Sequence, residues 1–297
     1  MRGAGAQGER GNGWRRLVVL LGVAGVSLSA VFVRWSTAPS VVLAFYRMAL
    51  SALLLLPAAL VRRKAFRALG RREVALSLLS GVFLGAHFTC YFESLRWTSI
   101  ASAVVLVDTS VLFVALASVL LFQKRLGGRA WLAVALAFGG SVIVALADGA
   151  GTGGGDALRG NLFALAGSAC VAVYTMLGSV CRRTLSTLVY TCLVYASAAG
   201  TVLAASLAGG QPLAGWGGVN LLTGLGMAVC CTLLGHSVFS WGLRYLPPAF
   251  ISTATLLEPV LAAVWGLLLF GERPGLAVAL GGGVILLGLT LYAREDG

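Results

Sequence analysis

The sequence predicts an all-α membrane protein with ten transmembrane helices, arranged as two inverted-topology repeats of five helices each. Composition is the first reason, because 59% of the 297 residues are apolar or aromatic and only 11% are charged. Soluble domains carry about 25% charged residues. Apolar runs long enough to cross ~30 Å of hydrocarbon recur from end to end. Unpaired backbone is not tolerated in lipid, so these runs are expected to be helices.

Ten apolar segments divide the chain, and the loops between them are short. The first segment resembles a signal peptide. However, Arg34 follows it, and the segment itself has a counterpart later in the chain, so we expect a membrane span. We expect spans at about 15–33, 40–61, 74–93, 99–122, 129–147, 160–180, 187–208, 219–241, 248–270 and 275–293.

The placement of basic residues predicts the orientation. A net charge of +12 could indicate a nucleic-acid partner, but the Lys and Arg residues gather at segment ends, six of them between Arg62 and Arg72. With the N-terminus inside, 17 of the 22 basic residues fall on the inner side and four on the outer side. This bias predicts cytoplasmic N- and C-termini and no nucleic-acid partner.

The two halves of the chain match each other at a constant offset of 148 residues. Leu95–Trp97 aligns with residues 243–245, and Arg34 aligns with Arg182. We therefore predict a first repeat at 1–147, a glycine-rich linker at 148–159 and a second repeat at 160–297. An odd number of spans per half makes the second half enter the membrane from the opposite side. This architecture is typical of secondary transporters.

Several short motifs resemble those of the drug/metabolite transporter superfamily, specifically its EamA-type members. The motifs are Leu257–Val260, Leu269–Glu272, the glycines at 281–283 and 288, Arg47, and Ala249. The resemblance covers residues 15 to 293 and implies export or exchange of a small metabolite with no cofactor, in a bacterial plasma membrane. The first half departs from the pattern, because Ser110 stands at the position of Glu258 and Lys124 at that of Glu272.

Two carboxylates fall near the middle of predicted spans, Asp108 in the fourth and Glu258 in the ninth. An ionised carboxylate at the bilayer centre costs roughly 2.5–3.5 kcal/mol. We therefore expect both to face a cavity, where they bind an amine or take up protons. Packing is the other interpretation of Glu258. Pro259 removes a backbone donor beside it and is expected to interrupt the ninth helix.

Four further residues are candidates for substrate binding or coupling. Arg47 is the basic residue inside a span, where it would neutralise a carboxylate or bind a substrate carboxylate. His87 shares a helix face with Tyr91 and would relay protons or bind substrate, or simply pack. Tyr174 and Trp265 are aromatic residues deep enough in their spans to line a pocket.

The predicted function is a secondary transporter that moves a small metabolite, such as an amino acid or amine, by alternating access, with possible proton coupling. A channel or lipid-moving protein is the alternative, and an intramembrane enzyme is a remote third because HExxH and GxSxG motifs are absent. The six cysteines lack CxxC spacing and are interpreted as small apolar residues, not metal ligands. The sequence does not predict an oligomeric state.

Overall fold

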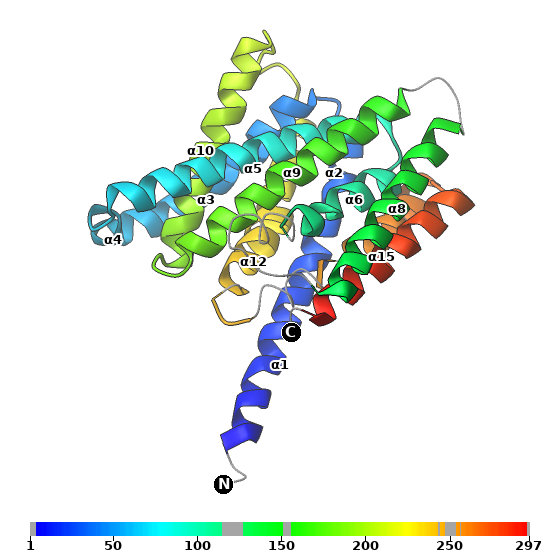
Figure 1. The fold of residues 1–297 in the computed structure, drawn as a ribbon. Coiled ribbons are helices and arrows are strands. Elements are labelled where there is room, and N and C mark those ends of the chain that lie inside the picture. The colour runs from blue at the N-terminus through cyan, green and yellow to red at the C-terminus, as the bar shows by residue number, and fades with distance from the viewer. Residues whose placement is uncertain are drawn as a thin grey trace.

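The computed structural model describes residues 4–114, 127–150, 156–242, 244–246, 254–255 and 257–295, and each element in these ranges is a helix (Figure 1). The elements are α1 (Ala4–Ser27), α2 (Ser29–Trp35), α3 (Ser40–Val61), α4 (Arg63–Arg67), α5 (Arg71–Trp97), α6 (Ile100–Asp108), α8 (Gly128–Ala150), α9 (Ala157–Cys181), α10 (Thr187–Ala208), α11 (Gly218–Gly226), the π-helix η1 (Met227–His236), α12 (Ser237–Gly242), α14 (Glu258–Phe270) and α15 (Leu276–Glu295).

Among the described residues, six helical segments are long and apolar enough to cross a membrane: Trp14–Trp35, Ser40–Val61, Arg71–Trp97, Ala157–Cys181, Thr187–Ala208 and Gly218–Gly242. Four shorter apolar helices lie in the other predicted spans: Ser102–Val114, Trp131–Gly140, Val260–Phe270 and Ala279–Gly288. The prediction of an all-helical, multi-span membrane protein is confirmed. The count of ten depends partly on residues 115–126 and 247–253, which lie outside the described ranges together with Lys124 and Ala249.

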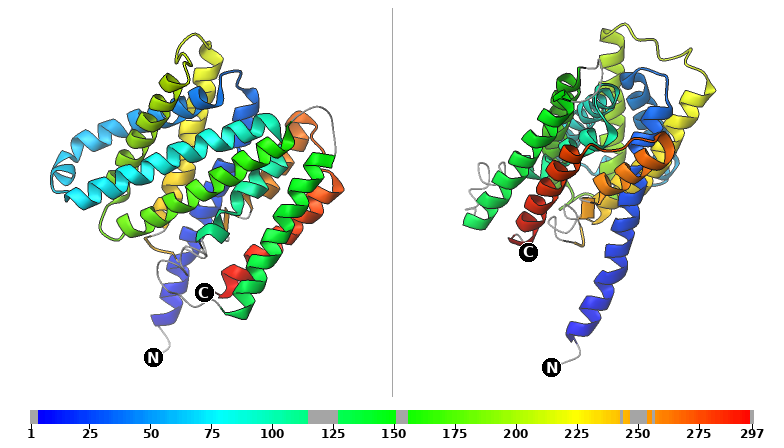
Figure 2. Two further views of the ribbon diagram at one scale, coloured as in Figure 1. Left: turned by 45° about the horizontal axis from the view of Figure 1, so that its top comes forward. Right: turned by 90° about the vertical axis from the view of Figure 1, so that its right-hand side faces the viewer.

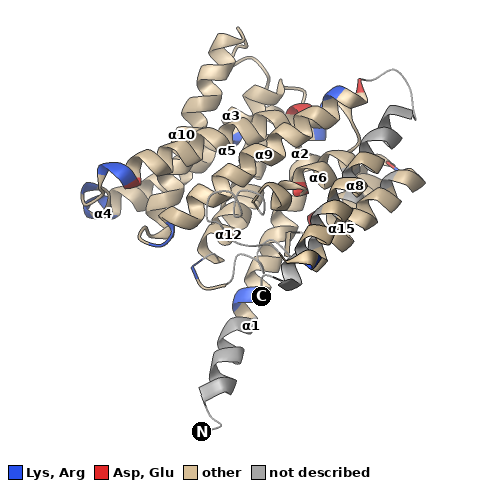
Figure 3. Ribbon diagram, in the orientation of Figure 1, with Lys and Arg blue, Asp and Glu red and all other residues tan. Residues whose placement is uncertain are grey.

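The outer surface of the bundle is apolar. Large side chains such as Leu60 on α3, Leu162 on α9 and Leu268 on α14 are between 58% and 68% exposed. Basic residues gather at α4 and at other helix ends, while the ribbon between these ends carries few charges (Figure 3). A surface of this kind is stable against lipid and would be a liability in water. The chain is therefore a multi-pass membrane protein.

The helices pack in pairs that repeat between the two halves of the chain. The first span contacts the eighth through α1 and η1, and the sixth contacts the third through α9 and α5. The fourth contacts the sixth through α6 and α9, and the ninth contacts the first through α14 and α1. Two pairs join equivalent helices, α3 with α10 and α8 with α15 (Figure 2). Each half therefore contributes to one shared bundle.

Glycines allow the closest of these contacts. On α5, a Cβ atom at Gly81 would lie 2.4 Å from the Val194 carbonyl oxygen, and one at Gly85 would lie 2.9 Å from that of Ala198. Such distances leave no room for a side chain, so α5 and α10 approach backbone to backbone. Small residues permit this kind of packing in membranes, where the hydrophobic effect does not drive helices together.

Candidate functional site

Two helices, one in each repeat, are interrupted at equivalent positions. In the fourth span, α6 ends at Asp108 and the chain turns at Thr109, whose N–H donates to the Leu106 carbonyl oxygen at 3.3 Å. In the ninth span the chain turns at Leu257, whose N–H donates to the Ala254 carbonyl oxygen at 3.1 Å, and α14 then begins. The two turns are 148 residues apart, the offset of the sequence repeat. Broken helices near the membrane midplane are where transporters build their sites.

One carboxylate lies beside each interruption. Asp108 is the last residue of α6 and is only 7% exposed, and its Oδ2 has no hydrogen-bond partner among the described residues. Glu258 is the first residue of α14 and is partly exposed, and Pro259 occupies the first turn of that helix. Proline is well suited to a first turn because its missing N–H would have no partner there anyway.

Arg47 is completely buried on α3 and is held by neutral groups. Its Nε donates to Thr232 Oγ1 and its Nη1 to Ser29 Oγ, both at 2.8 Å. The guanidinium carbon lies 3.9 Å from the centre of the Phe88 ring, a cation–π contact. Within the described part of the chain, Nη2 has no hydrogen-bond partner and no ion pair joins Arg47 to a carboxylate.

The partners of Arg47 come from two irregular points in other helices. Ser29 starts α2, directly after the break that Leu28 makes between α1 and α2. Thr232 lies in η1, a ten-residue π-helix, and its hydroxyl also donates to the Met227 carbonyl oxygen five residues earlier. π-helical segments are uncommon and often mark functional sites. The first, second and eighth spans therefore meet at one guanidinium.

Glu258 links Arg47 and Asp108 electrostatically, because it lies within range of both charges. Tyr91 lies within electrostatic range of all three residues. Its hydroxyl has no hydrogen-bond partner among the described residues, although the residue is only 4% exposed. We call these four residues the central cluster.

Aromatic and imidazole rings surround the central cluster. His87 stacks on Tyr91 with ring centres 6.0 Å apart, and its Nδ1 lies 2.9 Å from the Gly167 carbonyl oxygen on α9. The Phe88 ring meets His236 edge-on at 5.3 Å. His236 in turn lies 6.3 Å from the Tyr174 ring. His87 and Tyr174 thus belong to the same buried layer, on α5 and α9.

Trp265 lies on α14, in the helix that Glu258 begins. Its indole N–H donates to Ser27 Oγ on α1 at 3.2 Å, just before the break at Leu28. The side chain is partly exposed. This bond joins the ninth span to the first, so Trp265 is tied to the segment that supplies Ser29 to Arg47.

The sequence interpretation did not single out Ser27, Ser29 or Thr232, and it considered Tyr91 only as a neighbour of His87. Isolated hydroxyl residues are frequent in these spans, and many simply donate to their own helix, as Thr223 does to the Val219 carbonyl oxygen. No sequence signal separates the hydroxyls that bind side chains of other helices from those that donate within their own helix. Helical spacing does identify Tyr91 as a candidate, because it lies one turn from His87 on the same helix face.

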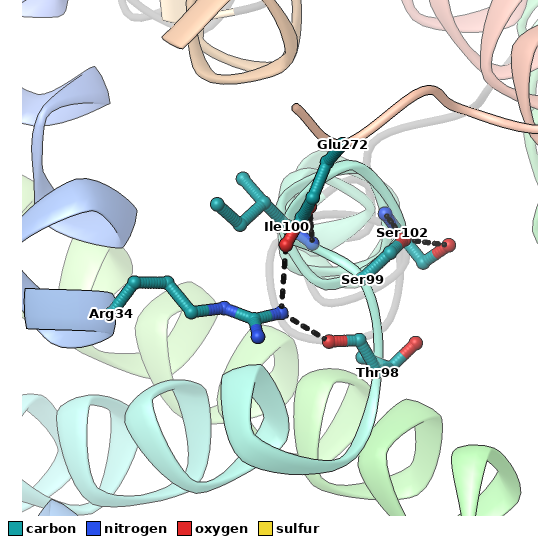
Figure 4. A network of polar contacts seen from close by, with 6 residues as sticks. All are labelled: Arg34, Thr98, Ser99, Ile100, Ser102 and Glu272. Carbon is teal, nitrogen blue, oxygen red and sulfur yellow. Dashed lines mark hydrogen bonds and ion pairs between the residues drawn. The ribbon is translucent and has the colours of Figure 1, made fainter. Parts of the chain in front are cut away.

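A second polar network lies around Arg34 and Glu272 (Figure 4). Arg34 Nη2 donates to the Thr98 carbonyl oxygen at 2.9 Å and lies 3.3 Å from Glu272 Oε1. Glu272 Oε2 also accepts the N–H of Ile100, in the first turn of α6, at 3.2 Å. Arg34 and Glu272 are 31% and 29% exposed. These contacts join α2, the start of α6 and the loop after α14.

Arg182, the counterpart of Arg34 in the second repeat, is bound differently. It is only 4% exposed, and its Nε donates to the Ser240 carbonyl oxygen at 2.9 Å. Its terminal nitrogens donate to the Leu185 carbonyl oxygen and to Thr187 Oγ1. The residue equivalent to Glu272 is Lys124, so this position offers no acidic partner. Arg34 therefore has an ionic partner, whereas Arg182 is held by neutral groups.

Metal binding receives no support from the described residues. Within them, no group of three or more His, Cys, Asp or Glu side chains could hold a metal ion. The six cysteines are free thiols, of which two are buried and four are partly buried. The titratable groups of the central cluster are one guanidinium, two carboxylates and a phenol.

Comparisons with known proteins agree with this arrangement. The model of the EamA-like transporter family matches twice, at residues 14–146 and 158–294. An uncharacterized transporter of Archaeoglobus fulgidus is 26% identical over 259 residues, which cover 86% of this chain and 88% of that protein. A solved crystal structure with 19% identity has the same fold, with a TM-score of 0.64 over 95% of this chain and 98% of the other. The two matches to one family model span nearly the whole sequence, so the chain belongs to the EamA-like transporter family.

Proposed function

We propose that this protein is a secondary transporter that moves a small polar metabolite, of the amino acid or amine type, by alternating access around the central cluster. Export or exchange is the proposed direction. The two repeats, at 1–147 and 160–297 with a linker at 148–159, are proposed to have opposite orientations in the membrane. Membership of a transporter family favours transport over catalysis.

The observation that carries this proposal is the pair of equivalent helix interruptions at Thr109 and Leu257. Each places a carboxylate beside a turn, in a bundle that both repeats build. A turn in a membrane helix leaves backbone groups that need partners, and an interior site can supply them. A structural role alone does not require a buried Asp108 Oδ2 that lacks a hydrogen-bond partner among the residues that the structure describes.

Proton coupling is proposed at the two carboxylates. Asp108 and Glu258 repel each other, and Arg47 attracts Glu258. When both carboxylates are ionised, one guanidinium leaves an excess negative charge in a low-dielectric interior. A proton or a cationic substrate group would compensate it. Asp108 is proposed as the coupling residue because it is the more buried of the two.

The proposed location is the plasma membrane of a bacterium, with both termini in the cytoplasm. The start of α1 and the end of α15 lie toward the same end of the bundle (Figure 1). The excess of basic residues on the inner loops supports this orientation. The Arg34–Glu272 network would then face the outside.

Uptake into proteoliposomes tests the proposal. Pooled labelled amino acids and amines would be offered with and without an inward proton gradient to wild type, Asp108→Asn and Glu258→Gln. Asp156→Asn is the matched control, because Asp156 is an exposed cap that accepts a hydrogen bond from the Arg159 N–H at 3.3 Å. We expect saturable flux in wild type and in Asp156→Asn, and a loss of at least tenfold in Asp108→Asn.

The gradient separates coupling from binding. If wild-type flux responds to the proton gradient and the residual flux of Asp108→Asn does not, Asp108 is the coupling residue. Equal saturable flux in all four proteins would contradict a role for either carboxylate. Non-saturating flux would favour a channel over a carrier.

A further inference from the structure

Arg47 is a buried guanidinium whose described surroundings supply hydrogen bonds but no direct counterion. Its Nε and Nη1 are each bonded to one hydroxyl, from Thr232 and Ser29. The Phe88 ring covers one face at 3.9 Å. These contacts fix the orientation of the group and leave Nη2 without a partner among the described residues. A cationic group in a membrane interior is costly unless it is paired.

Tyr91 supplies a second unused donor near this group. Its hydroxyl has no hydrogen-bond partner among the described residues, and its side chain is 4% exposed. It lies on α5 between Phe88 and Phe92, and the Arg47 guanidinium carbon lies 3.9 Å from the centre of the Phe88 ring and 5.8 Å from that of the Phe92 ring. The Tyr91 and Phe92 ring centres are 5.8 Å apart. A buried hydroxyl without a partner costs free energy that a bound acceptor would recover.

Both unused groups are donors, so their natural ligand is an anionic oxygen. The nearby carboxylates do not fill this role in the structure, because no ion pair within the described ranges joins either of them to Arg47. Asp108 Oδ2 has no hydrogen-bond partner in the described part of the chain and offers an acceptor to a cationic group. The central cluster thus has a donor side and an acceptor side.

We propose that Arg47 Nη2 and Tyr91 Oη form a carboxylate subsite, and that the substrate is a small zwitterion whose carboxylate binds there while its ammonium group faces Asp108. This inference rests on the proposed transport function and narrows its substrate class. Simple amines lack the group that the donor side binds, so they are expected to bind more weakly than the matching amino acids.

Matched ligand series test the subsite. The probes are alanine, leucine and phenylalanine, each with the amine that lacks its carboxylate and the acid that lacks its ammonium group. Binding to the full chain in lipid nanodiscs would be measured by calorimetry and by the shift in melting temperature. In wild type, we expect at least one amino acid to bind about tenfold more tightly than its matched amine, the factor of a charge-assisted hydrogen bond.

Two substitutions and two controls locate the effect. Arg47→Lys keeps the charge but changes the donor geometry, and Tyr91→Phe removes only the hydroxyl. We expect affinity for the amino acid to fall about tenfold in Arg47→Lys and about threefold in Tyr91→Phe, while affinity for the amine stays unchanged in both. Arg96→Lys and Tyr46→Phe are the controls. Arg96 binds Ser40 Oγ, and the Tyr46 hydroxyl donates to the Leu213 carbonyl oxygen, both outside the central cluster.

The outcomes separate this inference from the proposed transport. Equal binding of amino acid and matched amine in all three pairs in wild type would overturn the carboxylate subsite, and so would binding of none of the nine probes. Saturable flux of a solute without a carboxylate would leave the carrier standing and contradict the zwitterion. If Arg47→Lys fails to fold, the preference of Tyr91→Phe for amino acid over amine decides, and an unchanged preference overturns the subsite.

Discussion

Arg47 shows how a charged residue is accommodated in the interior of a membrane bundle. Thr232, Ser29 and Phe88 surround its guanidinium with two hydroxyl acceptors and an aromatic face. Hydrogen bonds to a charged group contribute about 1.5–3 kcal/mol each. The orientation of the group therefore depends on side chains from three different helices.

Thr232→Val tests the contribution of one of these bonds. The substitution conserves shape and leaves Arg47 Nε without its acceptor, so we expect the free energy of unfolding to fall by about 1.5–3 kcal/mol. Melting of the purified protein in detergent measures the loss. Thr223→Val is the control, because the Thr223 hydroxyl donates only to the carbonyl oxygen of Val219 in its own helix. Equal melting temperatures for the two variants would contradict a structural bond at Arg47.

At this scale the sequence supplied the charged groups of the candidate site but not their partners. Asp108, Glu258 and Arg47 stand out because charges are rare in apolar spans. Ser27, Ser29 and Thr232 resemble other hydroxyl residues of the same helices, and their role depends on breaks and on a π-helix that no local motif announces. The functional roles of the six candidates from the sequence stay predictions: Arg47, His87, Asp108, Tyr174, Glu258 and Trp265.

At the scale of the element, the interruptions of the fourth and ninth spans differ in how far the sequence announces them. Pro259 lies beside the turn at Leu257 and could be read directly. The turn at Thr109 has neither proline nor glycine nearby. There the Thr109 hydroxyl donates to the Leu106 carbonyl oxygen at 2.6 Å and lies 3.1 Å from Ser168 Oγ. Tertiary contact with α9 therefore accompanies a break that local sequence does not predict.

Adjacent glycines on α8 test the close packing of helices. A Cβ atom at Gly140 would lie 2.6 Å from the Gly281 carbonyl oxygen on α15, whereas one at Gly139 meets nothing within 4 Å. We expect Gly140→Ala to lower the free energy of unfolding by about 1–3 kcal/mol through overpacking. Gly139→Ala should be neutral or stabilising by up to about 1 kcal/mol, since alanine favours helix.

Melting curves of the two glycine variants in one detergent decide this prediction, because both gain the same methyl group on the same helix. A lower melting temperature for Gly139→Ala than for Gly140→Ala would contradict the described contact between α8 and α15.

At the scale of the molecule, the equivalent arginines of the two repeats have different partners. Arg34 pairs with Glu272 and is 31% exposed, whereas Arg182 is buried among neutral acceptors. A partly exposed ion pair contributes only about 0–1 kcal/mol. The network at Arg34 is therefore the one that can open at low cost, as the proposed alternating access requires.

Hydrogen exchange at the start of α6 tests this network. The Ile100 N–H donates to Glu272, so we expect Arg34→Gln and Glu272→Gln to raise exchange in residues 98–103 by about fivefold, the factor that ~1 kcal/mol represents. Mass spectrometry of peptides covering this segment measures the rates. Arg273→Gln removes a charge from the same exposed loop and should leave them unchanged. Equal exchange in all three variants would contradict a closing role for the network.

The overall architecture was the most predictable level. The limits of α3 and α10 coincide with the predicted spans 40–61 and 187–208, because predominantly apolar segments of this length define them. The repeat was visible as a constant offset, and the family model matches each half separately. Helix pairing was not predictable, because apolar faces in lipid carry little information about their partners.

Counterflow tests the central claim, alternating access, most directly. Proteoliposomes holding wild-type protein would be preloaded with the unlabelled amino acid that binds most tightly, and initial uptake of trace labelled amino acid would be followed. A carrier with one alternating site predicts saturable uptake that internal amino acid accelerates severalfold, and loss of that acceleration in Asp108→Asn. Uptake that does not saturate and ignores the internal amino acid would contradict the account and indicate a channel.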